Sequence, residues 1–424
     1  YATVRGTVAP PVDGGAILVL VPGLERSVTV DAVTGGFAVS DLPAGSFTVR
    51  IVPQSTDLGI VEIPADSLAP SSVTDLSSVA LPVFDAEDYA AWPHSVRIRI
   101  NTSARGAAVA EDIIGFPLLV RPDSSIPAFA FSANGNDLRF ASSNGNPLRY
   151  QIDWWDASFK QGGVWVLVDT IHGNDSSQSI TMFWGNAGAP SFSRGTAVFD
   201  SFAGYRGVWH LGGETPFADA SPYRHRTSNR GSIPFQSVLG GGVRFDGSSF
   251  IEVADDISLE PPSLTLSCWL RRDGAQADFA KIIHKGKLDA RPWPSYTLEF
   301  REQDHLVGFQ LAKIDTAARK VISRDSVRSG EWTHLAATFN QSTGTTELFV
   351  NGISLGTFID TLPIEYYVSR PFPLYFGGSP SYGQRITGIL DEIRIESMPR
   401  TSAWIRLCFE NQRPGGISIN FEAP

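Results

Sequence analysis

Cysteine is nearly absent from this chain, which has only Cys268 and Cys408 among its 424 residues. Two cysteines cannot build a framework of several disulfides, nor a zinc site made of cysteines. They either pair with each other or stay as two small buried apolar residues, and the sequence leaves both alternatives open. Cysteine content therefore does not define the compartment of the protein.

Long apolar runs and basic stripes are also missing. The longest purely apolar run, Ala16–Val21, is far shorter than the roughly 20 residues of a membrane-spanning helix. The formal net charge is −10, and no segment carries a row of basic residues. This pattern argues against nucleic acids and anionic membranes as partners.

Turn-forming and aromatic residues are abundant. The chain has 40 Gly, 28 Pro and 26 Phe, with only 18% charged residues, and this composition is typical of short strands joined by many turns. The length indicates more than one hydrophobic core. We therefore predict an all-β protein of several domains.

Residues 1–84 alternate apolar and polar positions between Gly- and Pro-rich turns. The run Thr34–Ile51, with Phe37 and Phe47, resembles prealbumin-like, carboxypeptidase-regulatory-like domains. The resemblance implies a seven-stranded β-sandwich that serves as a spacer. Residues 56–84 are rich in Ser, Pro and Asp, which predicts one last strand followed by a linker.

Residues 85–198 carry a second set of motifs, namely Ile114-Gly-Phe-Pro-Leu-Leu-Val-Arg121, Asp137-Leu-Arg-Phe140, Tyr150-Gln-Ile-Asp-Trp-Trp-Asp156 and Met182-Phe-Trp-Gly-Asn186. They resemble the bacterial DUF2341 domain, which implies another β-sandwich and no known activity. Gln151 and Asp153 differ from the acidic pair of that family. One of the successive Trp154 and Trp155 must face outward from a strand, so Trp155 is a candidate platform for a sugar ring, with core filling as the alternative.

Residues 199–416 contain a third set: Gly207-Val-Trp-His-Leu211, Asp219-Ala-Ser221, Ser263–Leu270, Glu331–Phe339 and Gly388–Ile395. This order resembles the laminin-G-like, concanavalin A-like jelly roll over the whole segment. We expect one helix, Ser402–Asn411, capped by Ser402. His210 and His334 lie in apolar strands, and we expect both to be satisfied core residues.

The strand Gly388–Ile395 carries the acidic pair Asp391-Glu392 inside an apolar run. Buried carboxylates are costly unless a cation, a metal ion or a row of donors compensates them. Glycosidases of this fold resemble Glu-x-Asp-x-x-Glu, but here Ile389 and Arg394 occupy the outer positions. We therefore predict a non-catalytic domain, with a jelly-roll glycoside hydrolase as an alternative.

A structural calcium site is the metal-binding hypothesis for this domain. The laminin-G-like resemblance implies that Asp219 and Asp391 approach each other at the rim. Backbone carbonyls of the expected turn Gly240–Val243, at Gly242 and Val243, would complete the oxygen ligands that calcium prefers. The alternative is that backbone amides, Arg244 or Arg394 hold Asp391.

Loop aromatics are the candidate ligand-binding residues of the third segment: Trp293, Tyr296, Tyr366, Tyr367 and Tyr382. We predict a secreted or surface-anchored bacterial protein that binds a polysaccharide or glycoconjugate, as an adhesin or a targeting module. The rival hypothesis is a subunit of a surface fibre that self-associates through the tail Ile417–Phe421. That tail is otherwise a strand returning to one of the sheets, or the start of a linker.

Overall fold

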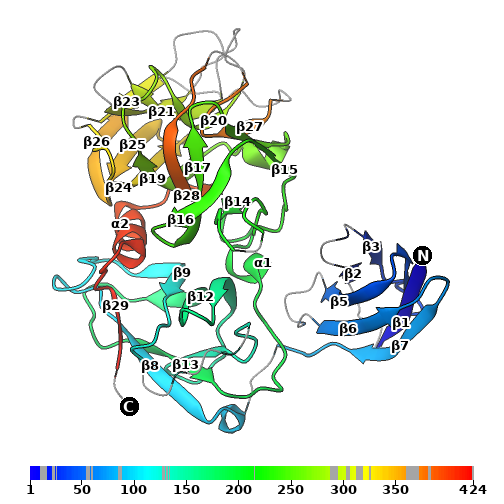
Figure 1. Cartoon of the computed structure of the whole chain (residues 1–424). Helices are drawn as coiled ribbons and strands as arrows, with labels where there is room; N and C mark the ends of the chain where they lie inside the picture. The colour runs from blue at the N-terminus through cyan, green and yellow to red at the C-terminus, as the bar shows by residue number, and fades with distance from the viewer. Residues whose placement is uncertain are drawn as a thin grey trace.

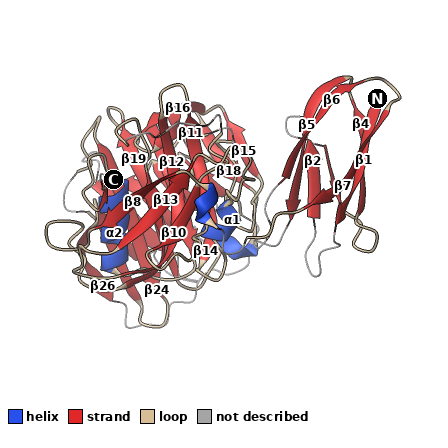
Figure 2. Cartoon of the chain, turned by 90° about the horizontal axis from the view of Figure 1, so that it is seen from below, coloured by secondary structure: helices blue, strands red, loops and turns tan. Residues whose placement is uncertain are grey.

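The computed structural model describes residues 1–9, 17–21, 24, 26–53, 58, 61–84, 88–126, 129, 132, 134–213, 215–286, 295–301, 306–311, 319–323, 326–359, 372–380 and 383–422. Its regular structure is nearly all strand, arranged as three β-sandwiches (Figures 1 and 2). The predicted all-β fold is confirmed. No helix of the described residues is long and apolar enough to cross a membrane.

The first sandwich has its own core, built around Val4, Val19, Val39 and Ile51. One sheet has the order β4-β1-β7 and the other β3-β2-β5-β6. Residues 61–80 form two strands instead of the single one expected: residues 61–68 pair with β5, and the backbone of residues 73–80 pairs in parallel with β1. The strands are β1 (Ala2–Ala9), β2 (Ile17–Val21), β3 (Arg26–Thr29), β4 (Gly36–Leu42), β5 (Gly45–Pro53), β6 (Val61–Leu68) and β7 (Val73–Ala80).

The second sandwich faces a sheet of order β11-β12-β9 against a sheet of order β10-β13-β8-β29. Alternation in β8, where Val96, Ile98 and Ile100 are buried between exposed arginines, gives this sheet its core side. The strands are β8 (His94–Ile100), β9 (Ile113–Val120), β10 (Arg139–Ser142), β11 (Tyr150–Asp156), β12 (Gln161–Ile171) and β13 (Ser179–Trp184). The short helix α1 (Gly195–Val198) follows them.

The third sandwich packs an eight-stranded sheet, β16-β17-β28-β19-β24-β25-β26 with β14 beside β28, on a seven-stranded sheet, β15-β18-β27-β20-β21-β22-β23. The first comprises β14 (Tyr205–Trp209), β16 (Ile233–Ser237), β17 (Gly240–Asp246), β19 (Leu264–Arg272), β24 (Trp332–Asn340), β25 (Thr345–Val350), β26 (Ile353–Ile359) and β28 (Thr387–Glu396). The second comprises β15 (Thr227–Arg230), β18 (Phe250–Val253), β20 (Lys281–Lys285), β21 (Tyr296–Arg301), β22 (Leu306–Leu311), β23 (Arg319–Ile322) and β27 (Leu374–Phe376).

The tail returns to the second sandwich. Strand β29 (Ile419–Phe421) pairs antiparallel with β8, so that Ile419 lies opposite Ile100 and Phe421 opposite Ile98. Arg99 and Glu422 form an ion pair beside this ladder. Of the alternatives for the tail, the returning strand is the one observed, and it completes a sheet formed more than 300 residues earlier in the chain.

Helix α2 (Ser402–Gln412) links the second and third sandwiches (Figure 1). Its cap is Thr401 rather than Ser402, because the Thr401 hydroxyl accepts the Trp404 amide at 3.2 Å. Trp404, Leu407 and Cys408 belong to the core of the second sandwich, although the helix follows the last strand of the third. Both cysteines are buried and free, so they do not pair.

Candidate functional site

Strand β28 carries the acidic pair on its outer face. Leu390, Ile393 and Ile395 point into the core of the third sandwich. Glu392 has a φ of 50°, and the pairing with β19 shifts register next to it, which marks a β-bulge. Because of the bulge, two successive residues, Asp391 and Glu392, both lie on the side away from that core.

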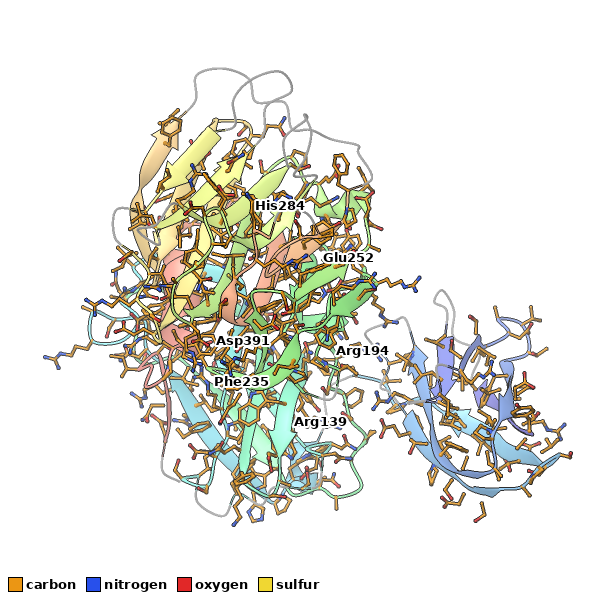
Figure 3. All side chains as sticks on the ribbon, turned by 45° about the horizontal axis from the view of Figure 1, so that its top comes forward. Arg139, Arg194, Phe235, Glu252, His284 and Asp391 are labelled. Atoms are coloured by element: carbon orange, nitrogen blue, oxygen red, sulfur yellow. The ribbon has the colours of Figure 1, made fainter. Side chains whose placement is uncertain are left out.

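The second sandwich covers this outer face. Leu119 of β9 and Trp165 of β12 pack with Tyr205, Val208 and Trp269 of the third sandwich in one apolar cluster. Asp391 is 0% and Glu392 2% exposed. Figure 3 shows Asp391 where the two sandwiches meet. The acidic pair therefore lies in an interface within the chain, and not at an open rim.

Glu392 is held by two basic side chains. One carboxylate oxygen contacts Nδ1 of His210, and the other accepts Nη2 of Arg394 at 3.0 Å. The Arg394 guanidinium lies 4.4 Å from the ring centre of Trp165. Burial alone would raise the pKa of Glu392, but His210 and Arg394 outweigh it and lower that pKa below its ordinary value. The contacts of Glu392 therefore favour its ionised form within the buried interface.

Asp153 brings a third charge from the second sandwich. Its Oδ2 accepts the indole N–H of Trp165 at 3.2 Å and lies 3.8 Å from Nδ1 of His210. Burial, opposed by His210, raises the pKa of Asp153 to about 6. The ligand atoms of Asp153, His210 and Glu392 all lie within 4.8 Å of one another. We expected His210 to be a satisfied core residue; it is buried, but within this charged cluster.

Asp391 is only half satisfied. Its Oδ2 accepts the hydroxyl of Ser237 and the backbone amide of Leu239 at 3.2 Å, whereas Oδ1 is buried without a hydrogen-bond partner. Burial and the neighbouring Glu392 raise its pKa well above the ordinary value. A backbone amide, one of the alternatives weighed above, does hold Asp391. The two arginines named with it are engaged elsewhere, Arg394 with Glu392 and Arg244 with Asp273.

Asp219 has a separate set of partners. Its carboxylate accepts the amides of Val208, Ser221 and His225, the Ser221 hydroxyl, and Nδ1 of His225 at 2.7 Å. It shares none of these partners with Asp391. A calcium ion bound to Asp219 would have to displace some of these donors, so the contacts do not favour the calcium hypothesis, which stays a prediction.

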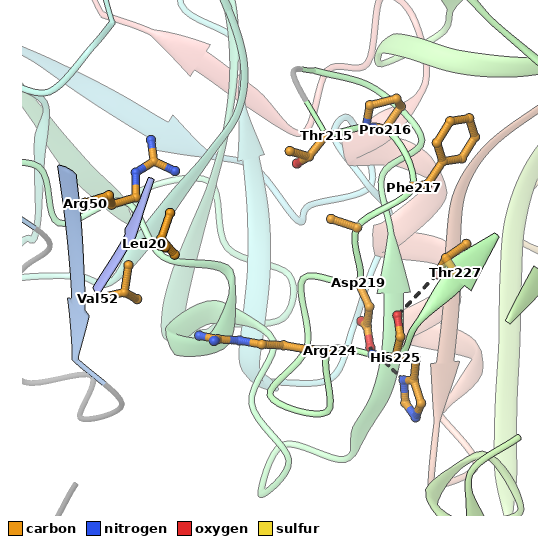
Figure 4. Close-up of a pocket in the computed structure, with 11 residues that line it drawn as sticks. Leu20, Arg50, Val52, Thr215, Pro216, Phe217, Asp219, Arg224, His225 and Thr227 are labelled. Carbon is orange, nitrogen blue, oxygen red and sulfur yellow. Dashed lines mark hydrogen bonds and ion pairs between the residues drawn. The ribbon is translucent and has the colours of Figure 1, made fainter. Parts of the chain in front are cut away.

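The backbone expected to complete that calcium site is regular strand. Gly242 and Val243 lie in β17, where Val243 pairs with Leu390, instead of in a turn. Asp219 itself lines an open cleft of about 680 Å³ between the first and third sandwiches (Figure 4). Arg50 and Val52 of β5 and Phe217 lie around the same cleft.

The aromatic residues predicted to bind ligand lie in different environments, and some of them lie outside the described residues. Trp293, Tyr366, Tyr367 and Tyr382 lie outside the described residues. Tyr296, expected at the surface, is fully buried, because it faces the core from β21 and its hydroxyl donates to the Leu259 carbonyl at 3.0 Å. Trp155 is half-buried, packs against the second core, and donates its indole N–H to the Ser132 carbonyl at 2.8 Å.

A row of polar side chains crosses the outer face of the seven-stranded sheet. Paired positions in neighbouring strands place Glu252 beside Tyr375, Tyr375 beside His284, and His284 beside Thr297. Glu252, at one end, is half-exposed, and His284, further in, is fully buried with Nε2 lacking a partner. Figure 3 shows both residues. The alternation of apolar and polar residues in Ile251-Glu-Val253 and Leu374-Tyr-Phe376 indicates that Glu252 and Tyr375 face away from the core. It does not indicate that the two side chains lie beside each other in the sheet.

Two family models match the chain. Residues 245–406 match the concanavalin A-like lectin/glucanases superfamily (Laminin_G_3), and residues 134–211 match the domain of unknown function DUF2341. Both domains predicted from their motifs are therefore found. The DUF2341 match extends past the expected boundary at residue 198 and includes His210. No curated protein matches the chain.

Several solved structures resemble part of the chain. The binding domain of Paraclostridial Mosquitocidal Protein 1 has 13% identity and a TM-score of 0.41 over 49% of this chain and 52% of its own. Domain 4 of AbnA, an extracellular arabinanase from Geobacillus stearothermophilus in complex with arabinotriose, has 13% identity and a TM-score of 0.40 over 50% of this chain and 99% of its own. The botulinum neurotoxin serotype D binding domain has 13% identity and a TM-score of 0.40 over 50% and 52%. The chain thus spans about half the length of the first and third.

Proposed function

We propose that this chain binds carbohydrate without catalysing its cleavage, through the outer face of the seven-stranded sheet. The observation that carries the proposal is the open end of that face, on β15, β18 and β27. There the half-exposed Phe250 and Glu252 lie beside Tyr375, with the exposed Arg230 opposite Phe250. The match of residues 245–406 to a superfamily of lectins and glucanases supports this class of ligand.

The chemistry of this end suits a sugar. The rings of Phe250 and Tyr375 meet edge to face, with centres 6.0 Å apart, and the guanidinium of Arg385 lies 5.2 Å from the Phe250 ring centre. Aromatic rings offer an apolar surface to the C–H groups of a pyranose, while carboxylate and guanidinium groups hydrogen-bond its hydroxyls. Few polar groups around an apolar platform are typical of small-ligand sites.

The paired charges of this domain favour binding over hydrolysis. A glycosidase needs an acid and a second carboxylate about 5–10 Å apart on either side of the scissile bond. On the outer face, Glu299 is bound by Lys281 and Arg301, each less than a tenth exposed. Asp391 and Glu392 are covered by the second sandwich. These carboxylates are therefore unavailable to a polymer in solution.

A glycan array followed by calorimetric titration of the retained glycan tests this function. We expect Glu252→Gln and Phe250→Ala to weaken binding at least tenfold, because each removes a partly exposed contact at the open end of the face. Glu331→Gln is the matched control, because it makes the same chemical change at an exposed residue directly before β24 of the other sheet. Absence of any retained glycan at millimolar concentration, or equal binding by all three variants, would contradict the proposal.

The setting of this function is also a proposal. We place the protein outside a bacterial cell or on its surface, as an adhesin or targeting module in which the first sandwich acts as a spacer. The separate core of the first sandwich supports that role. The tail residues Ile419–Phe421 already pair within the chain, which favours a binding module over a fibre built by strand exchange.

A further inference from the structure

We propose that Asp153, His210 and Glu392 bind a divalent transition-metal ion of the zinc type between the second and third sandwiches. One Asp oxygen, the imidazole Nδ1 and one Glu oxygen lie within 4.8 Å of one another. Zinc holds such atoms at about 2.0–2.2 Å, so that its ligand atoms stand roughly 3–3.5 Å apart. To admit the ion, Nδ1 and the Glu392 oxygen, now in direct contact, would have to separate, and the Asp153 oxygen, 3.8 Å from Nδ1, would have to move slightly closer.

Each of the three side chains is oriented by a partner outside the cluster. Nε2 of His210 lies 3.2 Å from Oε1 of Gln151, so that Nδ1 faces the carboxylates. Arg394 holds the second oxygen of Glu392 at 3.0 Å, and Trp165 donates to Asp153 at 3.2 Å. Such outer hydrogen bonds fix the ring orientation of a ligating histidine and the carboxylates beside it.

A second observation points to a cation at this place. Asp391, next to Glu392 on the same face of β28, is 0% exposed, and its Oδ1 has no partner. Its carboxyl group interacts electrostatically with Glu392 and Asp153, and also with the buried Arg121. Three buried carboxylates thus converge here. A metal ion bound to Asp153 and Glu392 would lower the electrostatic cost of gathering these buried carboxylates.

The donor set selects the class of metal. One imidazole nitrogen with two carboxylate oxygens suits zinc and neighbouring first-row ions, whereas calcium prefers oxygen ligands alone. Asp153 comes from β11 of the second sandwich, and Glu392 from β28 of the third. The ion would therefore join the two sandwiches to each other.

Zinc titration of the metal-stripped whole chain tests the proposal. We expect one zinc ion per chain by calorimetry and equilibrium dialysis, and an increase in Tm on zinc addition. Asp153→Asn and Glu392→Gln keep side-chain shape and should weaken zinc binding at least tenfold. Two controls should bind as wild type: Asp219→Asn, at an equally buried His–Asp pair, and His172→Gln, at the exposed pair with Asp112.

If Asp153→Asn or Glu392→Gln does not fold, crystals of the wild-type protein still test the proposal. Anomalous diffraction from zinc-soaked crystals should show one peak among Asp153, His210 and Glu392. Failure of the folded chain to bind stoichiometric zinc would overturn the proposal. So would loss of binding in His172→Gln, since the ion would then occupy the exposed pair. Stabilisation by calcium but not by zinc would overturn it in favour of Asp219 and Asp391.

Discussion

At the scale of single residues, burial has opposite consequences for different ionisable groups. His210 and Arg394 lower the pKa of Glu392 despite its burial, whereas burial and the charge of Glu392 raise the pKa of Asp391 against the effect of its hydrogen bonds with a hydroxyl and an amide. Among the described residues, His284 has no acidic partner that would stabilise its protonated form. Burial, with a smaller effect of Lys281, lowers its pKa from 6.5 to about 3. The direction of each pKa shift thus depends on the contacts of the buried group, and not on its residue type alone.

We predict that His284 makes folding sensitive to mild acid. Since the folded pKa is about 3 and the unfolded one 6.5, the unfolded chain binds more protons between these values. Stability is lost as pH falls below 6.5, by about 2 kcal/mol at pH 5. Urea unfolding at pH 7 and pH 5 should show a smaller loss in His284→Gln. The exposed His172→Gln should lose as much as wild type, and equal losses in all three proteins would refute the assignment.

The sequence showed that the acidic pair Asp391-Glu392 is unusual in an apolar strand, but it did not show which side chains contact this pair. An acidic pair in an apolar strand indicates that something must compensate it. His210, however, lies 182 residues from Glu392 in the sequence, and Asp153 belongs to another sandwich. Local patterns carry no information about such distant contacts. For the same reason Tyr296 was expected among the loop aromatics, whereas it lies in β21 and faces the core.

At the scale of elements, alternation predicted most strands, whereas packing between units decided the rest. Helix α2 was predicted within one residue at its end, yet its apolar side packs on the second sandwich. Strand β7 escaped detection because its alternation is interrupted by serines and aspartate. The bulge at Glu392 depends on a positive φ that no residue preference announces.

Strand β29 provides a prediction at this scale. Truncation after Gly416 should lower the Tm and produce concentration-dependent dimers, because the edge of β8 would lose its partner. Light scattering after size-exclusion chromatography and a melting curve measure both effects. Ile417→Ser, at a residue 51% exposed beside the strand, is the control and should behave as wild type. A truncated chain that stays monomeric with an unchanged Tm would show that β29 contributes little.

At the scale of the whole molecule, three sandwiches form two units. The first has a core of its own. The second and third share α2 and the apolar cluster around Trp165 and Trp269, as well as the charges of Asp153, His210 and Glu392. The motifs of the second and third segments correctly indicated a DUF2341 and a concanavalin A-like domain, but they gave no sign that the two share a core.

Scanning calorimetry of the whole chain should therefore resolve two transitions and not three. Cooperative units unfold together when they share buried surface, so the second and third sandwiches should melt as one. Asp153→Asn, which alters a contact between them, should shift the larger transition and leave that of the first sandwich unchanged. A third independent transition would contradict the fused unit.

The return of β29 to β8 also bears on biosynthesis. A chain emerges from the ribosome in order, and domains generally fold as they appear. Here the sheet that contains β8 obtains its last strand only after the whole third sandwich has been made. The edge of β8 in the nascent second sandwich therefore stays unpaired while the whole third sandwich is synthesised. During that interval the exposed edge of β8 could pair with another strand, so the late return of β29 also protects this edge from wrong partners.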